Sequence, residues 1–74
     1  MNMATKITFK VSAGDVINAL SRDGISISEY EASSILCKLD LNAVEKAAEE
    51  GVEQSEKIDY AYNEVCAQYW KIMG

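Results

Sequence analysis

The spacing of hydrophobic positions in this chain changes after the first dozen residues. Over residues 6–12, apolar Ile7, Phe9 and Val11 alternate with polar side chains. Alternation of this kind is the period of a strand with one buried face. We therefore predict a short amino-terminal β-strand from Lys6 to Ser12.

Helical spacing begins directly after this segment. Ser12 can cap a helix from about Ala13 to Arg22. Asp15 stands three residues later, where its carboxylate can accept the backbone N–H of Ser12 and complete a capping box. Gly24 stands where a left-handed residue commonly ends a helix. The predicted apolar side of this helix comprises Ala13, Val16, Ile17 and Leu20.

A second capping box, formed by Ser28 and Glu31, predicts a helix from about Glu29 to Leu39. One arc of this helix is apolar, and the opposite side carries smaller and polar residues on which another element could lie close. The apolar arc holds Ala32, Ile35, Leu36 and Leu39, and the opposite side holds Tyr30, Ser33 and Cys37.

The strongest pattern of the chain runs from about Leu41 to Met73, with a helix start at Asp40 or Asn42. Apolar and small residues recur at alternating steps of three and four, which is a heptad seam. Flanking apolar residues widen the seam, as a helical bundle requires, and polar Gln68 is the exception. The seam consists of Leu41, Val44, Ala48, Gly51, Ser55, Ile58, Tyr62, Val65, Tyr69 and Ile72.

The length of this segment leaves two arrangements open. A continuous helix would be about 50 Å long at ~1.5 Å per residue, whereas a globule of this size has a radius of gyration of about 11 Å. Either the helix breaks near Gly51 and folds back, or it stays long and its small residues mark a close crossing with a partner chain. We therefore predict a mainly α fold, with a short strand followed by three helices, the third long or broken near Gly51.

Composition favours one small folded domain over residues 1–74. The chain is 49% hydrophobic and 26% charged, which lies outside the range of disordered chains. A chain of this length buries only ~60% of its unfolded surface, so its stability is expected to be marginal. Oligomerisation is the simplest additional source of stability, and we expect a homodimer.

The sequence contains few residues that are suited to catalysis or to metal binding. There is no histidine, and the two cysteines, Cys37 and Cys66, are far apart in the sequence. No serine, threonine or cysteine has an evident general base, and a zinc site would lack ligands. We expect no enzyme, no cofactor and no membrane helix. The amino-terminal residues form no apolar signal core, so we expect a cytoplasmic protein.

Negative charge is concentrated in the third predicted helix. The chain has a net charge of −5, and from Asp40 to Glu64 eight acids stand against Lys46 and Lys57, a local balance of −6. Such a balance disfavours general nucleic-acid binding. Such a balance is most often a solvated helix face, and the alternative is a recognition surface for a basic partner.

Two observations favour a recognition surface. In a continuous helix, Glu45 with Glu49 and Glu49 with Glu53 would be like-charge pairs that cost a few tenths of a kcal/mol each. Aromatic residues among or beside these charges are frequent in protein interfaces, although Trp70 could instead cover the core. The predicted partner-binding residues are Glu45, Glu49, Glu53, Glu56, Tyr60 and Trp70.

Residues 6–39, an alternating strand followed by two capped helices, resemble a ribbon-helix-helix DNA-binding domain. The resemblance implies a dimer in which the two strands pair and their outward residues read the major groove. It further implies phosphate contacts at the start of the second helix. The residues concerned are Lys6, Thr8 and Lys10 in the strand and Ser26 and Ser28 before the helix.

Three hypotheses about function follow. The first is a small acidic interaction protein that regulates or inhibits a larger macromolecule, in the manner of phage- or mobile-element-type inhibitors. The second is the homodimeric DNA-binding regulator that the resemblance implies. The third is a structural assembly subunit that uses the heptad seam.

Overall fold

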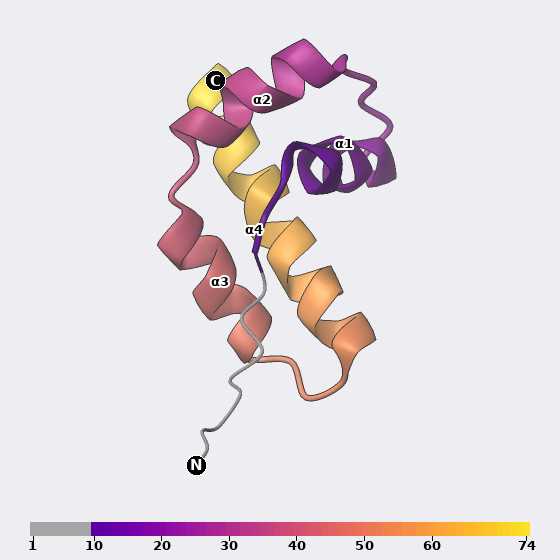
Figure 1. Cartoon of the computed structure of the whole chain (residues 1–74), viewed down its shortest axis with the longest axis vertical. Coiled ribbons are helices and arrows are strands. Elements are labelled where there is room, and N and C mark those ends of the chain that lie inside the picture. Colours follow the sequence, from indigo (N-terminus) through magenta and orange to yellow (C-terminus); the bar gives the residue numbers. More distant parts are fainter. Residues whose placement is uncertain (1–9) are drawn as a thin grey trace.

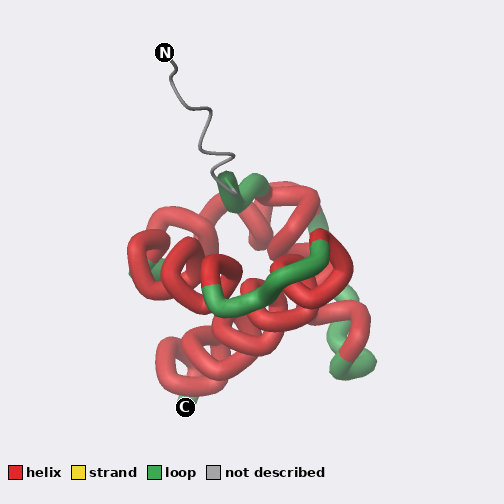
Figure 2. The backbone as a smooth tube through the Cα atoms, turned by 90° about the horizontal axis from the view of Figure 1, so that it is seen from below, coloured by secondary structure: helices red, strands yellow, loops and turns green. Residues whose placement is uncertain are grey.

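The computed structural model describes residues 10–74, and this part of the chain is mainly helical, as predicted. The hairpin of α3 and α4 runs antiparallel, and α1 and α2 lie beside the carboxyl-terminal half of α4 (Figure 1). Seen from below, the helices are joined only by loops (Figure 2). The four helices are α1 (Ala13–Arg22), α2 (Glu29–Lys38), α3 (Leu41–Glu49) and α4 (Gln54–Met73).

The predicted amino-terminal strand falls mostly outside the described residues. Within the described part, residues 10–12 form an irregular segment that leads into α1. The strand from Lys6 to Ser12 therefore stays a prediction.

Both predicted capping boxes are present. The backbone N–H of Asp15 donates to Ser12 Oγ at 3.3 Å, and the N–H of Ser12 donates to Asp15 Oδ2 at 2.9 Å. At the start of α2, the N–H of Glu31 donates to Ser28 Oγ at 3.1 Å, and the N–H of Ser28 donates to Glu31 Oε1 at 3.0 Å. Each box pairs helix N–H groups that have no partner within the helix, so the two starts lie where local sequence predicted them.

Gly24 ends α1 as predicted. Its φ of 78° is left-handed, which is a conformation that glycine adopts without steric cost. The N–H of Gly24 donates to the carbonyl of Ser21 at 3.0 Å, and the N–H of Ile25 donates to that of Leu20 at 2.9 Å. These two bonds form a Schellman motif that turns the chain toward α2.

The predicted third helix is broken at Gly51, so residues 10–74 form four helices where three were predicted. Gly51 is buried against the first turn of α4, and a Cβ atom there would lie 2.6 Å from the backbone nitrogen of Lys57. Only glycine allows α3 and α4 to approach so closely. Of the two arrangements left open by the sequence, the structure has the helix that folds back.

The core is built by all four helices and buries most of the heptad seam, although Leu41 and Ser55 stay exposed. α4 contacts both α3 and α1, and α1 contacts α2. The buried seam residues, which were predicted to face either a bundle or another chain, lie between helices of this one chain. The buried core residues are Val16, Ala19, Leu20, Ala32, Ile35, Leu39, Val44, Ala48, Ala61, Tyr62 and Val65.

Candidate functional site

The break before α4 divides the predicted partner-binding residues between two antiparallel helices. The i,i+4 relation assumed for Glu49 and Glu53 does not exist, because residues 50–53 are not helical. The predicted acidic face is therefore two separate patches. Glu45 and Glu49 lie on α3, and Glu53, Glu56, Tyr60 and Trp70 lie at the start of α4 or along it.

The patch on α3 surrounds a shallow depression of about 480 Å³. Glu45 is half-buried and Glu49 is exposed, and both line the depression together with Asp40 and Lys46. Asp40 also caps α3, since the N–H of Ala43 donates to its Oδ1 at 3.3 Å. The patch thus presents three carboxylates and one ammonium group to solvent.

The Glu56 side chain accepts backbone hydrogen bonds at the start of α4. The backbone N–H groups of Val52 and Glu53 donate to its Oε1 at 3.0 and 3.2 Å. These hydrogen bonds lower the pKa of the Glu56 carboxyl group, because they stabilise the charged form. Part of the acceptor capacity of Glu56 is therefore engaged within the chain, whereas Glu53 is exposed.

Two aromatic residues stay exposed on α4. Tyr60 is 43% exposed and Trp70 is 57% exposed, although Tyr62 and Tyr69 of the same helix pack into or against the core. The ring of Trp70 meets that of Tyr69 edge to face, with centroids 5.3 Å apart. Edge-to-face packing is one of the favoured arrangements of aromatic pairs.

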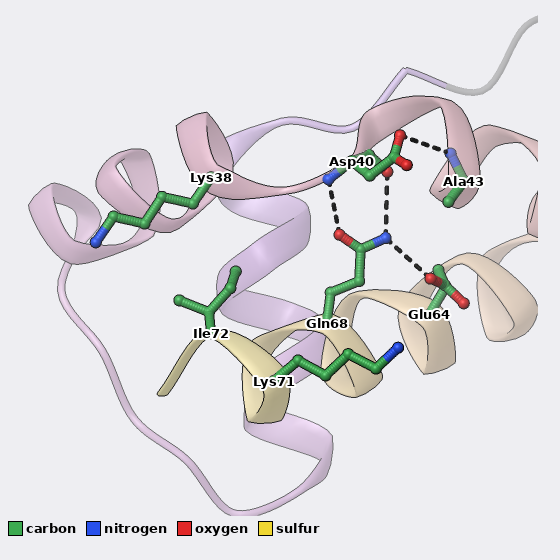
Figure 3. A pocket seen from close by; sticks show the side chains of 7 residues that line it. All are labelled: Lys38, Asp40, Ala43, Glu64, Gln68, Lys71 and Ile72. Atoms are coloured by element: carbon green, nitrogen blue, oxygen red, sulfur yellow. Dashed lines mark hydrogen bonds between the residues drawn. The ribbon is translucent and has the colours of Figure 1, made fainter. Parts of the chain in front are cut away.

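Gln68, the polar exception in the predicted seam, ties α4 to the α2–α3 connection (Figure 3). Its Oε1 accepts the N–H of Asp40 at 2.7 Å, while its Nε2 donates to the carbonyl of Asp40 at 3.2 Å and to Glu64 Oε2 at 2.9 Å. The side-chain amide thus pairs with both backbone groups of an extended residue. A depression of about 300 Å³ opens beside this clamp.

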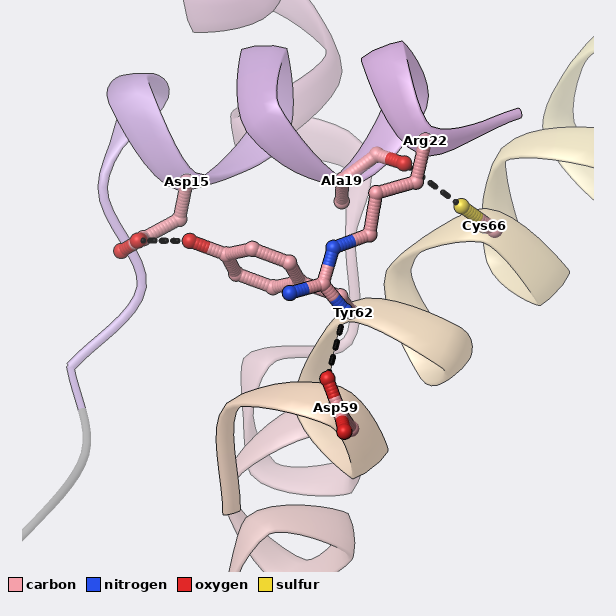
Figure 4. Close-up of polar contacts among 6 residues, drawn as sticks. All are labelled: Asp15, Ala19, Arg22, Asp59, Tyr62 and Cys66. Carbon is pink, nitrogen blue, oxygen red and sulfur yellow. Dashed lines mark hydrogen bonds and ion pairs between the residues drawn. The ribbon is translucent and has the colours of Figure 1, made fainter. Parts of the chain in front are cut away.

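A second polar cluster joins α1 to α4, and sequence reasoning missed it (Figure 4). The guanidinium group of Arg22 lies over the ring of Tyr62, 4.7 Å from its centroid, and forms an ion pair with Asp59 Oδ1 at 2.7 Å. The only sign in the sequence was that Arg22 is the sole arginine of the chain. Because both ends of the ion pair are about half exposed, the pair itself contributes little stability.

The residues of the DNA-binding alternative are only partly placed. Lys6 and Thr8 lie outside the described residues, and Lys10 is exposed on the irregular segment before α1. Ser26 is exposed in the loop before α2, whereas Ser28 is engaged in its capping box with Glu31. The Glu31 carboxylate beside Ser28 would repel a phosphate group.

Comparisons with protein-family models, curated proteins and solved structures give no match for this chain.

The chemical character of the remaining side chains bears on catalysis and metal binding. Cys66 donates a hydrogen bond to the carbonyl of Ala19 at 3.2 Å, and desolvation, with Asp23 nearby, raises the pKa of its thiol to about 11. A thiol with this pKa is protonated at neutral pH and is a poor nucleophile. Within residues 10–74 no group of three potential metal ligands was found.

No helix of the described part is long and apolar enough to cross a lipid bilayer.

Proposed function

We propose that this protein is a non-enzymatic interaction protein that binds a larger macromolecule and regulates or inhibits it. The observation that carries this proposal is the exposure of Tyr60 and Trp70 on one helix whose remaining aromatic residues are packed. Tyrosine and tryptophan supply a large share of binding energy in protein interfaces. Their presence on the surface of so small a domain favours binding over catalysis.

The acids define the kind of partner. Glu53 and Glu56 stand near Tyr60 at the amino-terminal end of α4, and Glu45 and Glu49 form the separate patch on α3. A protein surface with lysine or arginine opposite these residues would gain in association rate and in specificity. Regulation or inhibition then follows from occupying a functional surface of that partner.

A homodimer is not needed to bury the heptad seam. Val44 and Ala48 on α3 and Tyr62 and Val65 on α4 are buried within one chain. The predicted homodimer therefore remains a prediction, and light scattering over a range of concentrations tests it.

The proposal is tested by affinity capture of the partner from the native host, followed by binding measurements with two double variants. Tyr60→Ala/Trp70→Ala removes the aromatic contacts, and Glu45→Lys/Glu49→Lys reverses the α3 patch. We expect the first variant to lose the partner and the second to bind it more weakly. Unchanged binding by both folded variants would overturn the proposal.

A further inference from the structure

α4 carries two heptad seams on different sides. The inner seam, with Ile58, Tyr62 and Val65, packs against the rest of the domain. A second series of residues, spaced three and four apart on the opposite side, is exposed throughout. We call it the outer stripe, and it consists of Tyr60, Asn63, Ala67 and Trp70.

The outer stripe has the composition of a helix-docking surface. Tyr60 and Trp70 are large and amphipathic anchors, and the small side chain of Ala67 between them lets a facing backbone approach. Asn63 is a single polar residue at a seam position, which in paired helices specifies the register. The stripe spans about 15 Å, or roughly three helical turns.

We propose that the outer stripe docks an amphipathic helix of a different protein along α4. This inference rests on the proposed function and specifies its partner. The bound helix lays its apolar residues over Tyr60, Ala67 and Trp70, in the mode by which amphipathic helices are recognised elsewhere.

Charges beside the stripe define the partner further. Lys57, Glu64 and Lys71 are seven residues apart and follow one edge of the stripe in the order basic, acidic, basic. Figure 3 shows Glu64 and Lys71 lining the depression beside Gln68, where the Glu64 carboxylate accepts a hydrogen bond from Gln68 Nε2 at 2.9 Å. Among the described residues, none of these three makes an ion pair. A complementary helix carries the order acidic, basic, acidic along its facing edge.

The same charges disfavour a second copy of this chain as the occupant. In an antiparallel pair centred on the stripe, the Glu64 residues of the two copies would face each other, and Lys57 would face Lys71. In a parallel pair, Asp59 of one copy would face Glu64 of the other. Like charges in facing positions act against a wrong partner.

The experiment uses two synthetic helical peptides without tryptophan. Both carry the same apolar seam, and they differ only in the order of the edge charges: acidic, basic, acidic in the matched peptide and the reverse in the control. Trp70 is the only tryptophan of the chain, so its fluorescence reports on the proposed interface. We expect a saturable blue shift with the matched peptide and at least about tenfold weaker binding of the control.

A pair of protein variants locates the contact. Ala67→Glu places a charge in the centre of the stripe and should abolish the blue shift. Ser33→Glu, on an exposed position of α2, should leave binding within about twofold. Circular dichroism of both variants confirms that the helices are retained, so that loss of binding is not loss of fold.

Three binding results would each overturn the inference: no saturable shift with the matched peptide, equal binding of the two peptides, or unaffected binding by Ala67→Glu. A doubling of mass in light scattering that Ala67→Glu abolishes would assign the stripe to a second copy and also overturn it. If the captured partner is lost with Tyr60→Ala/Trp70→Ala while neither peptide binds, the proposed function stands and only the helical partner is wrong.

Discussion

The hydroxyl group of Tyr62 on α4 donates a hydrogen bond to Asp15 Oδ1 on α1 at 2.8 Å. The other carboxylate oxygen of Asp15 accepts the N–H of Ser12 and so completes the capping box. One side chain therefore starts α1 and also holds it against α4. Asp15 thus takes part both in the capping box that begins α1 and in the hydrogen bond that positions α1 against α4.

Tyr62→Phe removes this contact and keeps the ring that lies beneath Arg22. We expect the free energy of unfolding to fall by about 1 kcal/mol, which is typical of one hydrogen bond. Urea unfolding followed by circular dichroism measures the change. Tyr30→Phe is the matched control, because Tyr30 is 85% exposed, and its stability should match that of the unsubstituted protein. Equal stability of both variants would mean that the Tyr62–Asp15 bond contributes nothing.

Alkaline pH should destabilise the protein through Cys66. The folded state raises the pKa of the Cys66 thiol from 9.0 to about 11, chiefly by desolvation. The folded state then holds its proton more tightly than the unfolded chain, so this contribution is complete below about pH 9 and is lost as pH rises through 11. Burial also raises the pKa of Tyr62, which adds to the loss above its ordinary value of 10.0.

Cys66→Ala removes one of these two groups. We expect its stability to decline less steeply between pH 8 and pH 11 than that of the unsubstituted protein, as measured by urea unfolding at each pH. Cys37→Ala is the control, since Cys37 is exposed, and it should retain the original decline. A decline that Cys66→Ala leaves unaltered would rule out the thiol as its cause.

The hydrogen bonds that Gln68 makes with Asp40 and Glu64 should stabilise the folded protein. Gln68→Glu keeps the shape of the side chain, but it replaces the Nε2 group with a carboxylate oxygen. The hydrogen bonds that Nε2 donates to the carbonyl oxygen of Asp40 and to Glu64 Oε2 are then lost. We expect a loss of about 1–3 kcal/mol at pH 7, since polar groups are left unpaired beside a like charge. The loss should shrink when acid protonates the new carboxyl group.

Gln54→Glu provides the control for this substitution. Gln54 is exposed in the first turn of α4, where a negative charge is favourable by about 0.3–1 kcal/mol. Thermal unfolding of both variants at pH 7 and pH 4 separates the loss of the clamp from a simple effect of added charge.

Gly51→Ala should be strongly destabilising. The added Cβ would lie 2.6 Å from the backbone nitrogen of Lys57 and 2.8 Å from the carbonyl carbon of Glu56, and neither backbone atom can move away alone. Overpacking of this kind costs about 1–3 kcal/mol. Gly14→Ala is the control, because its Cβ meets only Ser12 Oγ at 3.7 Å. Helix propensity should make that variant as stable as the original or up to about 1 kcal/mol more stable.

The ribbon-helix-helix alternative makes a separate prediction. If it holds, the protein retains duplex DNA at low salt, and Lys6→Ala/Lys10→Ala abolishes both the retention and its salt dependence. Under the proposed function, no DNA is retained even at low salt. An electrophoretic mobility shift at 20 mM salt decides between the two.

Helix starts and stops were predictable because the groups that form them are neighbours in the chain. The boxes at Ser12 and Ser28 and the left-handed turn at Gly24 join residues no more than five positions apart. The same holds for the burial pattern of α1 and α2, where the apolar spacing selected Val16 and Ile35 as core. Short-range bonds of this kind need no knowledge of the rest of the fold.

Sequence alone thus determined that this chain is mainly helical, where its first two helices begin and end, and which side of each is apolar. Tertiary structure decided that the segment from Leu41 to Met73 folds back, because the same seam could pair with itself or with another chain and only the close approach at Gly51 selects between them. It also placed Glu49 and Tyr60 on different helices and brought Gln68 to Asp40. Both relations depend on how the helices pack, and no periodicity along the chain encodes them.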